Sequence, residues 1–476
     1  MKSIDLRCVL LDTSKSIYSS FLDFLDKKKK PAIPNHTHIG KGFHLKDIKE
    51  EQFVDINLNN DFRRGHIIGF GTTGAGKSRL IESMVEQDIM LFGNSVVVID
   101  PKVDNALLSR VYQAAVRSGN ERAFMLLSPI HPKLSVKINP MSNYFMDEEI
   151  IGHIVSAIET SGDIFFYNIA LEVSTAIVKS RLLIKKYVKD NTPLNFREIY
   201  RYAGYEGLQQ LKENLEKINN SKDRDLEDMV ILINNVLGSN ADYFAKVVSS
   251  LRTTLTQMST GAIGSVFGGA TKNRFIDMLE NDEKVILYVQ TPSMLSKKTS
   301  DITAKVTLSM IQSCIGRRAI SDQTFKHGLS IYIDESSNSL YQGIENLFNK
   351  SRSTNTRITA LSQNYADYID AVGREKAKMI LGNANGKIFM RLVDPDTAED
   401  AARYAGEITK WDSVISTNGI MSKQTMDMAL KSEDLLSLMP REFYYFGMEG
   451  QFKGKTAPIG DTEIKINPPK MGGSRK

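Results

Sequence analysis

One octapeptide restricts the folds open to this chain more than any other feature. Residues 71–78 read GTTGAGKS, which satisfies the pattern G-x-x-x-x-G-K-[ST]. The apolar run HIIGF precedes the octapeptide, and RLIESMVEQDIML, with apolar residues at helical spacing, follows it. A strand, a glycine-rich turn and a helix in this order are typical of a phosphate-binding loop. The sequence therefore predicts an α/β domain that binds a nucleotide.

Each residue type in the octapeptide has a physical role in holding phosphate. Glycines let the backbone curl, so that successive N–H groups and the helix N-terminus face the β- and γ-phosphates. Lys77 adds a positive charge there, and the Ser78 hydroxyl can complete the coordination shell of Mg²⁺. We therefore predict ATP and Mg²⁺ as ligands, with the nucleotide bound by Gly71, Thr72, Thr73, Gly74, Ala75, Gly76, Lys77 and Ser78.

Further apolar runs predict a parallel sheet around this loop. SVVVID (95–100) is apolar on both faces, as expected of a buried parallel strand, and ERAFMLL (121–127) follows after a helical pattern. Strand patterns return later in the chain, separated by helical patterns, at 284–290, 329–336, 357–363 and 386–392. Because strands and helices alternate, we expect a mostly parallel sheet.

The same patterns divide the chain into five segments. Residues 61–144 and 263–460 are predicted to form the two parts of the nucleotide-binding domain. Residues 145–262 read as successive amphipathic helices and predict an inserted all-α domain. Residues 461–476 are expected to be a disordered tail. Residues 1–60 are expected to be a lead-in, with an amphipathic helix followed by a basic linker: Ile17, Phe21, Phe24 and Leu25, then Lys27 to Lys30.

A carboxylate at the end of a neighbouring strand is expected beside a phosphate-binding loop, because it holds the Mg²⁺ shell. IYIDE (331–335) supplies one. Asp334 is predicted to serve the metal together with Ser78, and Glu335 to orient and deprotonate the attacking water, which indicates hydrolysis. Asp100, which also ends an apolar strand, is the alternative metal carboxylate, ranked lower because no second acid follows it.

Two polar residues near the next strand complete the predicted catalytic set of Lys77, Glu335, Arg352 and Gln363. Gln363 ends that strand and is predicted to contact the γ-phosphate, although it could simply cap the strand. Arg352, in the loop before the strand, is predicted to stabilise transition-state charge across a subunit boundary. A solvated loop arginine is the alternative for Arg352, and Arg357 is the next candidate for its role.

Composition excludes several other classes of protein. The net charge of +5 is too small to indicate nucleic-acid binding by itself. Cys8 and Cys314 fit no C-x-x-C spacing, which argues against disulfide frameworks and zinc ribbons and favours a reducing compartment. His36 and His38 have no further ligand at a suitable spacing. No run approaches about 18 apolar residues and no signal-peptide pattern occurs, so no membrane-spanning segment is expected.

Taken together, the motifs resemble those of type IV secretion coupling proteins of the TraD/TraG kind. The resemblance covers about residues 39–460 and rests on GFGTTGAGKS, VVVIDPKVD, KVILYVQTP, IYIDESSN and SRSTNTRITALSQN, with IGKGFHL before them and SEDLLSLMPREFYYF after them. It implies a RecA-like P-loop ATPase core that assembles as a homo-hexameric ring with its all-α domain at one mouth. It also assigns Lys77 and Ser78 to the phosphate loop, Asp334 and Glu335 to the acidic motif, Gln363 to a sensor and Arg352 to a finger.

The resemblance further implies a function in conjugation. Such proteins move DNA, with its attached relaxase, to a type IV secretion channel. Such proteins usually begin with transmembrane helices, whereas no such segment is expected here. We therefore expect this chain to be cytoplasmic and peripheral at the inner face of the membrane. Either an anchoring partner or the lead-in helix would replace the missing helices, or this member works in another way. DNA binding is expected to be non-specific, through phosphate contacts, because no base-reading motif occurs.

Two other functions stay open. An FtsK/HerA-like DNA-pumping ATPase would have much the same catalytic residues. A receptor or scaffold that selects secretion substrates, with ATP as an assembly switch, would not translocate DNA. ATPase activity stimulated by DNA separates either motor from the scaffold.

Overall fold

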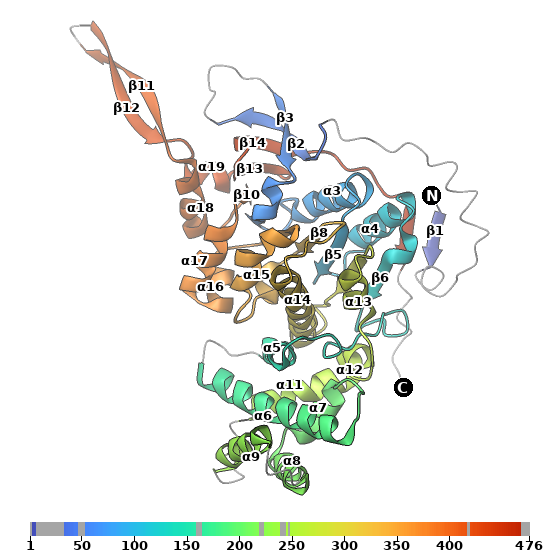
Figure 1. The fold of residues 1–476 in the computed structure, drawn as a ribbon. Coiled ribbons are helices and arrows are strands. Elements are labelled where there is room, and N and C mark those ends of the chain that lie inside the picture. Colours follow the sequence, from blue (N-terminus) through green and yellow to red (C-terminus); the bar gives the residue numbers. More distant parts are fainter. Residues whose placement is uncertain are drawn as a thin grey trace.

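A large mixed sheet with helices on both faces forms the centre of the molecule (Figure 1). The computed structural model describes residues 2–5, 33–45, 53–158, 164–218, 223–238, 244–245, 248–416 and 419–467. The amphipathic helix and lysine run predicted at 17–30 lie outside these residues. The predicted α/β fold class is confirmed.

One side of the 11-stranded sheet, from β10 to the edge strand β6, is parallel. Every residue in six of its strands is buried, because helices cover both faces and exclude water from them. Since these strands run in one direction, the loops that follow them meet at one edge of the sheet. Across the sheet the parallel strands are β10 (Gly386–Met390), β4 (Ile67–Phe70), β9 (Thr356–Ser362), β8 (Leu329–Ile333), β5 (Ser95–Asp100), β7 (Ile286–Gln290) and β6 (Phe124–Leu127).

Antiparallel strands extend the sheet beyond β10. They are β13 (Glu442–Gly447), β14 (Gly450–Thr456), β2 (His36–His44) and β3 (Val54–Asn59). The sheet therefore includes residues 36–44 and 54–59, and the prediction that these residues belong to a lead-in outside the nucleotide-binding domain is wrong. Their pattern is weak because glycine replaces apolar residues where backbones approach: a Cβ on Gly42 would lie 2.0 Å from the Lys453 carbonyl oxygen.

A second small sheet joins the two ends of the chain. β15 (Ile464–Asn467) pairs in parallel with β1 (Lys2–Asp5). Ser109 Oγ accepts a hydrogen bond from the Ile466 N–H at 2.9 Å, and Gln113 Oε1 accepts one from the Ile464 N–H at 3.0 Å. The predicted disorder of residues 461–476 is thus wrong for 464–467, which polar side chains of a distant helix hold in place.

Alternate residues of each central strand pack against different layers of helices. Val96 and Val98 belong to the core beneath α3 (Lys77–Met90) and α4 (Asn105–Arg117). Val97 and Ile99 belong to the core on the other face, which includes α14 (Lys297–Ile320). The period of two in a strand explains this division. The second core continues into the helical insertion, so both parts share buried apolar contacts.

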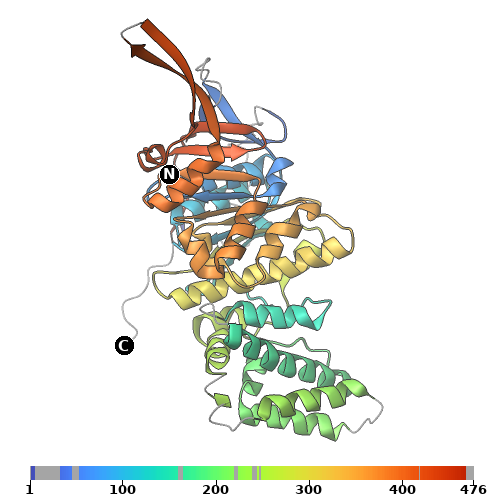
Figure 2. The ribbon, with the colours of Figure 1, turned by 90° about the vertical axis from the view of Figure 1, so that its left-hand side faces the viewer.

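In the described part of the chain, every element between β6 and β7 is helical, apart from connecting loops. Figure 2 shows most of these helices gathered at one end of the molecule. They are α5 (Asp147–Ser156), α6 (Ile164–Val188), α7 (Phe196–Tyr202), α8 (Tyr205–Lys217), α9 (Arg224–Leu237), α11 (Ser249–Ser259), α12 (Gly261–Phe267) and α13 (Arg274–Glu280). Among the residues whose structure is described, no helix is both long and apolar enough to cross a membrane.

The remaining elements connect the strands. A hairpin of β11 (Glu407–Ser416) and β12 (Gly419–Met428) projects from the body of the molecule (Figure 1). The other helices and turns are η1 (Phe62–Gly65), η2 (Glu121–Ala123), η3 (Ser336–Ser339), α15 (Glu345–Lys350), η4 (Ser351–Thr354), α16 (Ala366–Val372), α17 (Arg374–Asn383), α18 (Pro395–Ala402), η5 (Arg403–Ala405) and α19 (Ser432–Leu436).

A buried ion pair links η1 to helix α3, and a hydrogen bond to Tyr332 links it to strand β8. Arg63 donates to both carboxylate oxygens of Asp88, at 2.9 and 3.1 Å, and to the Tyr332 hydroxyl at 2.8 Å. Both charged side chains are at most 2% exposed. Burial alone would raise the pKa of Asp88, but Arg63 outweighs that effect and holds the pKa below its usual value. The pair therefore stays charged inside the protein.

We predict that Asp88→Ala destabilises the fold by about 3–5 kcal/mol, because it leaves the Arg63 charge buried without its partner. Chemical denaturation would measure the change in unfolding free energy. Asp400→Ala is the control, since it removes a pair with Arg403 in which both side chains are exposed, and it should cost at most about 1 kcal/mol. Equal effects of the two substitutions would contradict a special role for the buried pair.

One buried histidine lies where the helical insertion meets the core. His153 of α5 places Nδ1 2.8 Å from Ser309 Oγ of α14. Burial lowers the pKa of His153 to about 3, and the positive charge of Arg317 acts in the same direction. The ring is therefore neutral in the folded protein near neutral pH.

This neutral ring predicts a loss of stability in acid. Below about pH 6.5 the unfolded chain protonates His153 and the folded protein does not, so the loss grows as pH falls toward 3. At pH 5 it amounts to about 2 kcal/mol relative to pH 7.5. His153→Asn keeps a polar group beside Ser309 but does not titrate there. Denaturation curves at the two pH values would measure the unfolding free energy of each protein. Its fall between pH 7.5 and pH 5 should be smaller in the variant by about 2 kcal/mol. An equal fall in both proteins would refute this role of His153.

Candidate functional site

The octapeptide forms a loop between β4 and α3. Gly74 has φ +79° and Gly76 has φ +111°, conformations that favour glycine. A Cβ on Gly71 would come within 2.8 Å of Met390 Cβ on the neighbouring strand. Thr73 and Gly74 are exposed, so the top of the loop is open to a ligand. The loop has the backbone freedom and access that phosphate binding requires.

Three later segments hold the loop through its backbone. The Gly71 N–H donates to the Ser362 carbonyl at 3.1 Å, and the Thr72 N–H donates to the Arg391 carbonyl at 2.8 Å. The Arg441 N–H donates to the Ala75 carbonyl at 2.8 Å. Sequence reasoning missed Arg391 and Arg441. Because their backbones make the contacts, no side-chain pattern indicates them.

Lys77 and Ser78 begin helix α3 directly below the loop. The Lys77 ammonium is buried and donates to the carbonyls of Gly71 and Thr72, the latter at 3.2 Å. Burial lowers the pKa of Lys77, and the nearby charge of Lys102 adds to the effect. The Ser78 hydroxyl donates to Asp334 Oδ2 at 3.0 Å. The structure thus brings Ser78 and Asp334 together, although they are far apart in sequence.

The acidic pair lies at the end of β8. Asp334 is 2% exposed, and its Oδ1 accepts the Glu335 N–H at 3.0 Å. Glu335 has φ +46°, a left-handed conformation that turns its side chain away from the strand direction. The Lys102 ammonium lies 2.8 Å from Asp334 Oδ2 and 3.5 Å from Glu335 Oε1. Among the residues that the structure describes, Lys102, which the sequence did not indicate, is the cation that pairs with both acids.

These residues fit a magnesium–nucleotide complex. A hydroxyl and a carboxylate oxygen are the ligands that Mg²⁺ prefers, and Ser78 and Asp334 supply them from two elements. Within the described residues, no cluster of three or more His, Cys, Asp or Glu side chains could hold a metal ion alone. A metal at Ser78 and Asp334 would therefore complete its shell with phosphate oxygens and water.

Asp100, the alternative metal carboxylate, is engaged elsewhere. Its Oδ1 accepts the Lys102 N–H at 3.0 Å, and its Oδ2 accepts the Asp104 N–H and the Tyr288 hydroxyl, both at 2.6 Å. Burial raises the pKa of Asp100 to about 6, although these hydrogen bonds oppose the rise. The carboxylate holds the turn after β5. This engagement favours Asp334 over Asp100 as the metal ligand.

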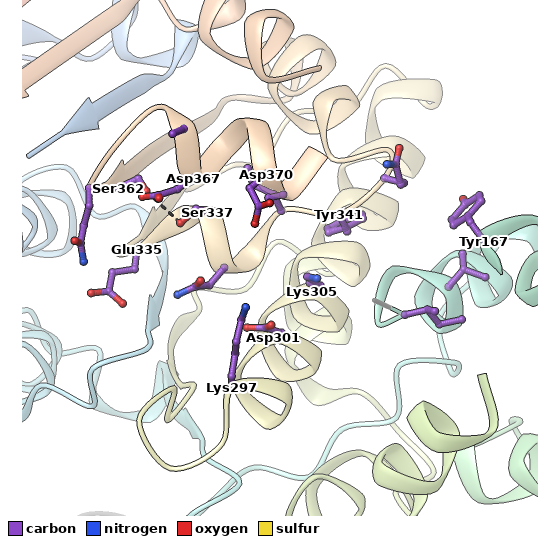
Figure 3. A pocket seen from close by; sticks show the side chains of 18 residues that line it. Tyr167, Lys297, Asp301, Lys305, Glu335, Ser337, Tyr341, Ser362, Asp367 and Asp370 are labelled. Atoms are coloured by element: carbon purple, nitrogen blue, oxygen red, sulfur yellow. Dashed lines mark hydrogen bonds between the residues drawn. The ribbon is translucent and has the colours of Figure 1, made fainter. Parts of the chain in front are cut away.

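A cavity of about 730 Å³ opens beside Glu335 and extends toward the helical insertion. Glu335 and Gln363 both line it, from the ends of β8 and β9. Figure 3 shows Lys297 and Asp301 of α14 opposite Asp367 and Asp370 of α16. Gln363 thus faces the same space as the proposed base, as its place at a strand end predicts.

Arg352, predicted to stabilise transition-state charge, and Arg357, the next candidate for that role, lie toward the opposite edge of the sheet. Arg352 is exposed in η4, before β9 begins, whereas Gln363 follows the last residue of β9. The seven residues of this strand span about 23 Å. Arg352 is therefore too distant to act in its own subunit's site. Arg357 is 7% exposed and donates to the Asn60 carbonyl at 3.1 Å, which excludes it as the alternative finger in this conformation.

Sequence comparison places this site among known proteins. Residues 329–441 match the family model described as the TraM recognition site of TraD and TraG. Type 4 coupling protein DotL of Legionella pneumophila (strain Philadelphia 1) is 22% identical over 449 residues, which covers 84% of this chain and 56% of DotL. The chain thus spans about half the length of this relative.

Solved structures share the fold. The unbound form of the bacterial conjugative coupling protein TrwB is 15% identical, with a TM-score of 0.68 over 95% of this chain and 93% of TrwB. TrwB with ADP and Mg²⁺ is 16% identical, with a TM-score of 0.65 over 85% of this chain and 88% of that TrwB chain. VirB4 of Thermoanaerobacter pseudethanolicus is 12% identical, with a TM-score of 0.56 over 90% of this chain and 98% of VirB4. These neighbours show that the chain shares the α/β fold of TrwB and VirB4.

The family match, the DotL similarity and the TrwB fold agree with the motifs that surround the phosphate-binding loop. In sequence and in fold, this chain is similar to type IV secretion coupling proteins, as its motifs predict.

Proposed function

We propose that this chain is a Mg²⁺-dependent ATPase that assembles as a ring and drives DNA, with its attached relaxase, to a type IV secretion channel. The observation that carries the proposal is the meeting of Ser78, Asp334 and Glu335 beneath a phosphate-binding loop. The TrwB structures support the choice of ligands, because TrwB binds ADP with Mg²⁺ in one of them.

Each site residue has a proposed role in ATP hydrolysis. Ser78 and Asp334 would hold Mg²⁺, which when bound withdraws electron density from the phosphate oxygens. Lys77 would exchange the carbonyls of Gly71 and Thr72 for phosphate oxygens. Glu335 would take a proton from the water whose oxygen attacks the γ-phosphorus, while the bond to the bridging oxygen breaks. Gln363 would contact the γ-phosphate from the end of β9.

The comparisons also support the proposed partners and location. The match to a TraM recognition segment supports relaxosome partners, and the DotL similarity supports a place in a type IV secretion system. We infer that DNA is bound through its phosphates, without sequence preference. The chain would work at the inner face of the membrane, next to the secretion channel.

DNA-dependent ATPase activity is the experiment that tests the proposal. The rate of phosphate release should rise when DNA is added, and the rise should shrink as salt is increased, because phosphate contacts release counterions. Activity that DNA leaves unchanged would instead favour the receptor or scaffold, in which ATP controls assembly alone.

We predict that Lys77→Ala and Glu335→Gln each lower the rate of ATP hydrolysis by at least about 100-fold. Lys77→Ala should also weaken nucleotide binding, because the loop loses its side-chain cation. Glu335→Gln should bind ATP normally, since it removes only the base. Steady-state phosphate release and equilibrium binding of a fluorescent ATP analogue would measure these effects. Glu283→Gln, an exposed surface change, is the control. A Glu335→Gln protein that hydrolyses ATP near the wild-type rate would refute the role of Glu335.

We also predict that Arg352 acts across a subunit boundary, since it cannot reach its own site. Arg352→Ala should lose activity, and mixing it with Lys77→Ala should restore part of it, because some interfaces then pair an intact loop with an intact arginine. ATPase rates of proven mixed assemblies would measure the rescue. Lys350→Ala, which changes an exposed neighbour, should stay active. Inactive mixtures would show that Arg352 does not act in the adjacent site.

A further inference from the structure

The Lys102 side chain bonds the carboxylate oxygen that faces Ser78. Asp334 Oδ2 accepts a hydrogen bond from the Lys102 ammonium at 2.8 Å and one from the Ser78 hydroxyl at 3.0 Å. Ser78 and Asp334 are the residues that fit Mg²⁺. The ammonium group therefore lies on the oxygen that a metal at this site would use.

The turn after β5 aims Lys102 at this position. Asp100 anchors the turn by accepting the backbone N–H groups of Lys102 and Asp104. Val103 has φ +57°, which is strained for a β-branched residue and shows that the turn is tightly constrained. Tyr288 fixes the Asp100 carboxylate from the neighbouring strand. The hydrogen-bonded turn thus directs the Lys102 side chain toward the acids.

Burial explains why Asp334 needs a cation. The carboxylate is 2% exposed, so an unpaired charge there would be costly. The Lys102 side chain is 34% exposed and can leave toward solvent without crossing the core. The Lys102 ammonium supplies the counter-charge, 2.8 Å from Asp334 Oδ2.

We propose that Lys102 and Mg²⁺ compete for Asp334: the ammonium group neutralises the buried carboxylate when no metal is bound, and Mg²⁺ displaces it on binding. A lysine and a divalent cation repel each other strongly at one carboxylate oxygen, so both cannot occupy it. Lys102 is a positioning residue for the acidic pair, and it makes metal binding depend on a second source of negative charge. Nucleotide phosphates supply that charge. This inference rests on the proposed ATPase function for its metal.

Thermal unfolding of the full chain without nucleotide tests the competition. In EDTA, Lys102→Met should unfold at least about 3 °C below wild type, because Asp334 loses its counter-charge. Millimolar Mg²⁺ should restore most of that loss in Lys102→Met while moving wild type little. Lys102→Arg, which keeps the charge, should behave like wild type. Lys297→Met removes a lysine that lines the cavity beside Glu335 and should show no gain in Mg²⁺ response.

Two further measurements complete the test. Adding Asp334→Asn to Lys102→Met should abolish the Mg²⁺ response, because the metal then has no carboxylate. Binding of Mn²⁺, followed by electron paramagnetic resonance without nucleotide, should be weak in wild type and at least about tenfold tighter in Lys102→Met. The wild-type measurement applies even if the variant does not fold.

Several results would overturn the proposal. Tight Mn²⁺ binding to nucleotide-free wild type would do so, as would equal Mg²⁺ responses in wild type and Lys102→Met. No nucleotide is present in these measurements, so their outcome is separate from that of the ATPase assays. If the protein does not hydrolyse ATP but Lys102 still competes with the metal for Asp334, only the proposed function is rejected. If it hydrolyses ATP but shows no such competition, only the role of Lys102 is rejected.

Discussion

The buried contact of Arg63 with Asp88 and Tyr332 fixes the distance between the two halves of the site. Asp88 lies near the end of α3, the helix that begins with Lys77 and Ser78, and Tyr332 lies two residues before Asp334 on β8. With no water available to replace the lost bonds, the helix and the strand cannot slide past each other without exposing a buried charge. The hydrogen bond from Ser78 to Asp334 is therefore formed before any ligand arrives, which lowers the cost of binding one.

The phosphate-binding loop depends equally on distant parts of the chain. Carbonyl and N–H groups of Ser362, Arg391 and Arg441 complete the backbone bonds of Gly71, Thr72 and Ala75. The helical insertion separates these segments in sequence, so the loop reaches its final shape only when the second part of the sheet has formed. Such long-range pairing is slow and costly in loop entropy, and it couples nucleotide binding to the folding of the whole core.

Local patterns predict the parts of this site that local geometry determines. The octapeptide, the buried strands and the acids at their ends follow from backbone shape and burial, and the structure brings Ser78, Asp334 and Glu335 together accordingly. Lys102 was not predicted, because its position depends on a turn that Asp100 and Tyr288 hold from separate strands. Strands β2 and β15 were missed for a related reason. Glycine at close backbone contacts weakens the pattern of β2, and polar side chains of α4 stabilise β15.

Arg352 lies before strand β9 and Gln363 follows its last residue, and every residue of the strand itself is buried. A strand packed on both faces transmits displacement along its length with little compression. In a closed ring of such subunits, each β9 would connect two consecutive nucleotide sites, one at each end. A movement of Gln363 on phosphate release would then shift Arg352 at the next site. The order in which the sites of the ring hydrolyse ATP would therefore depend on the rigidity of one strand.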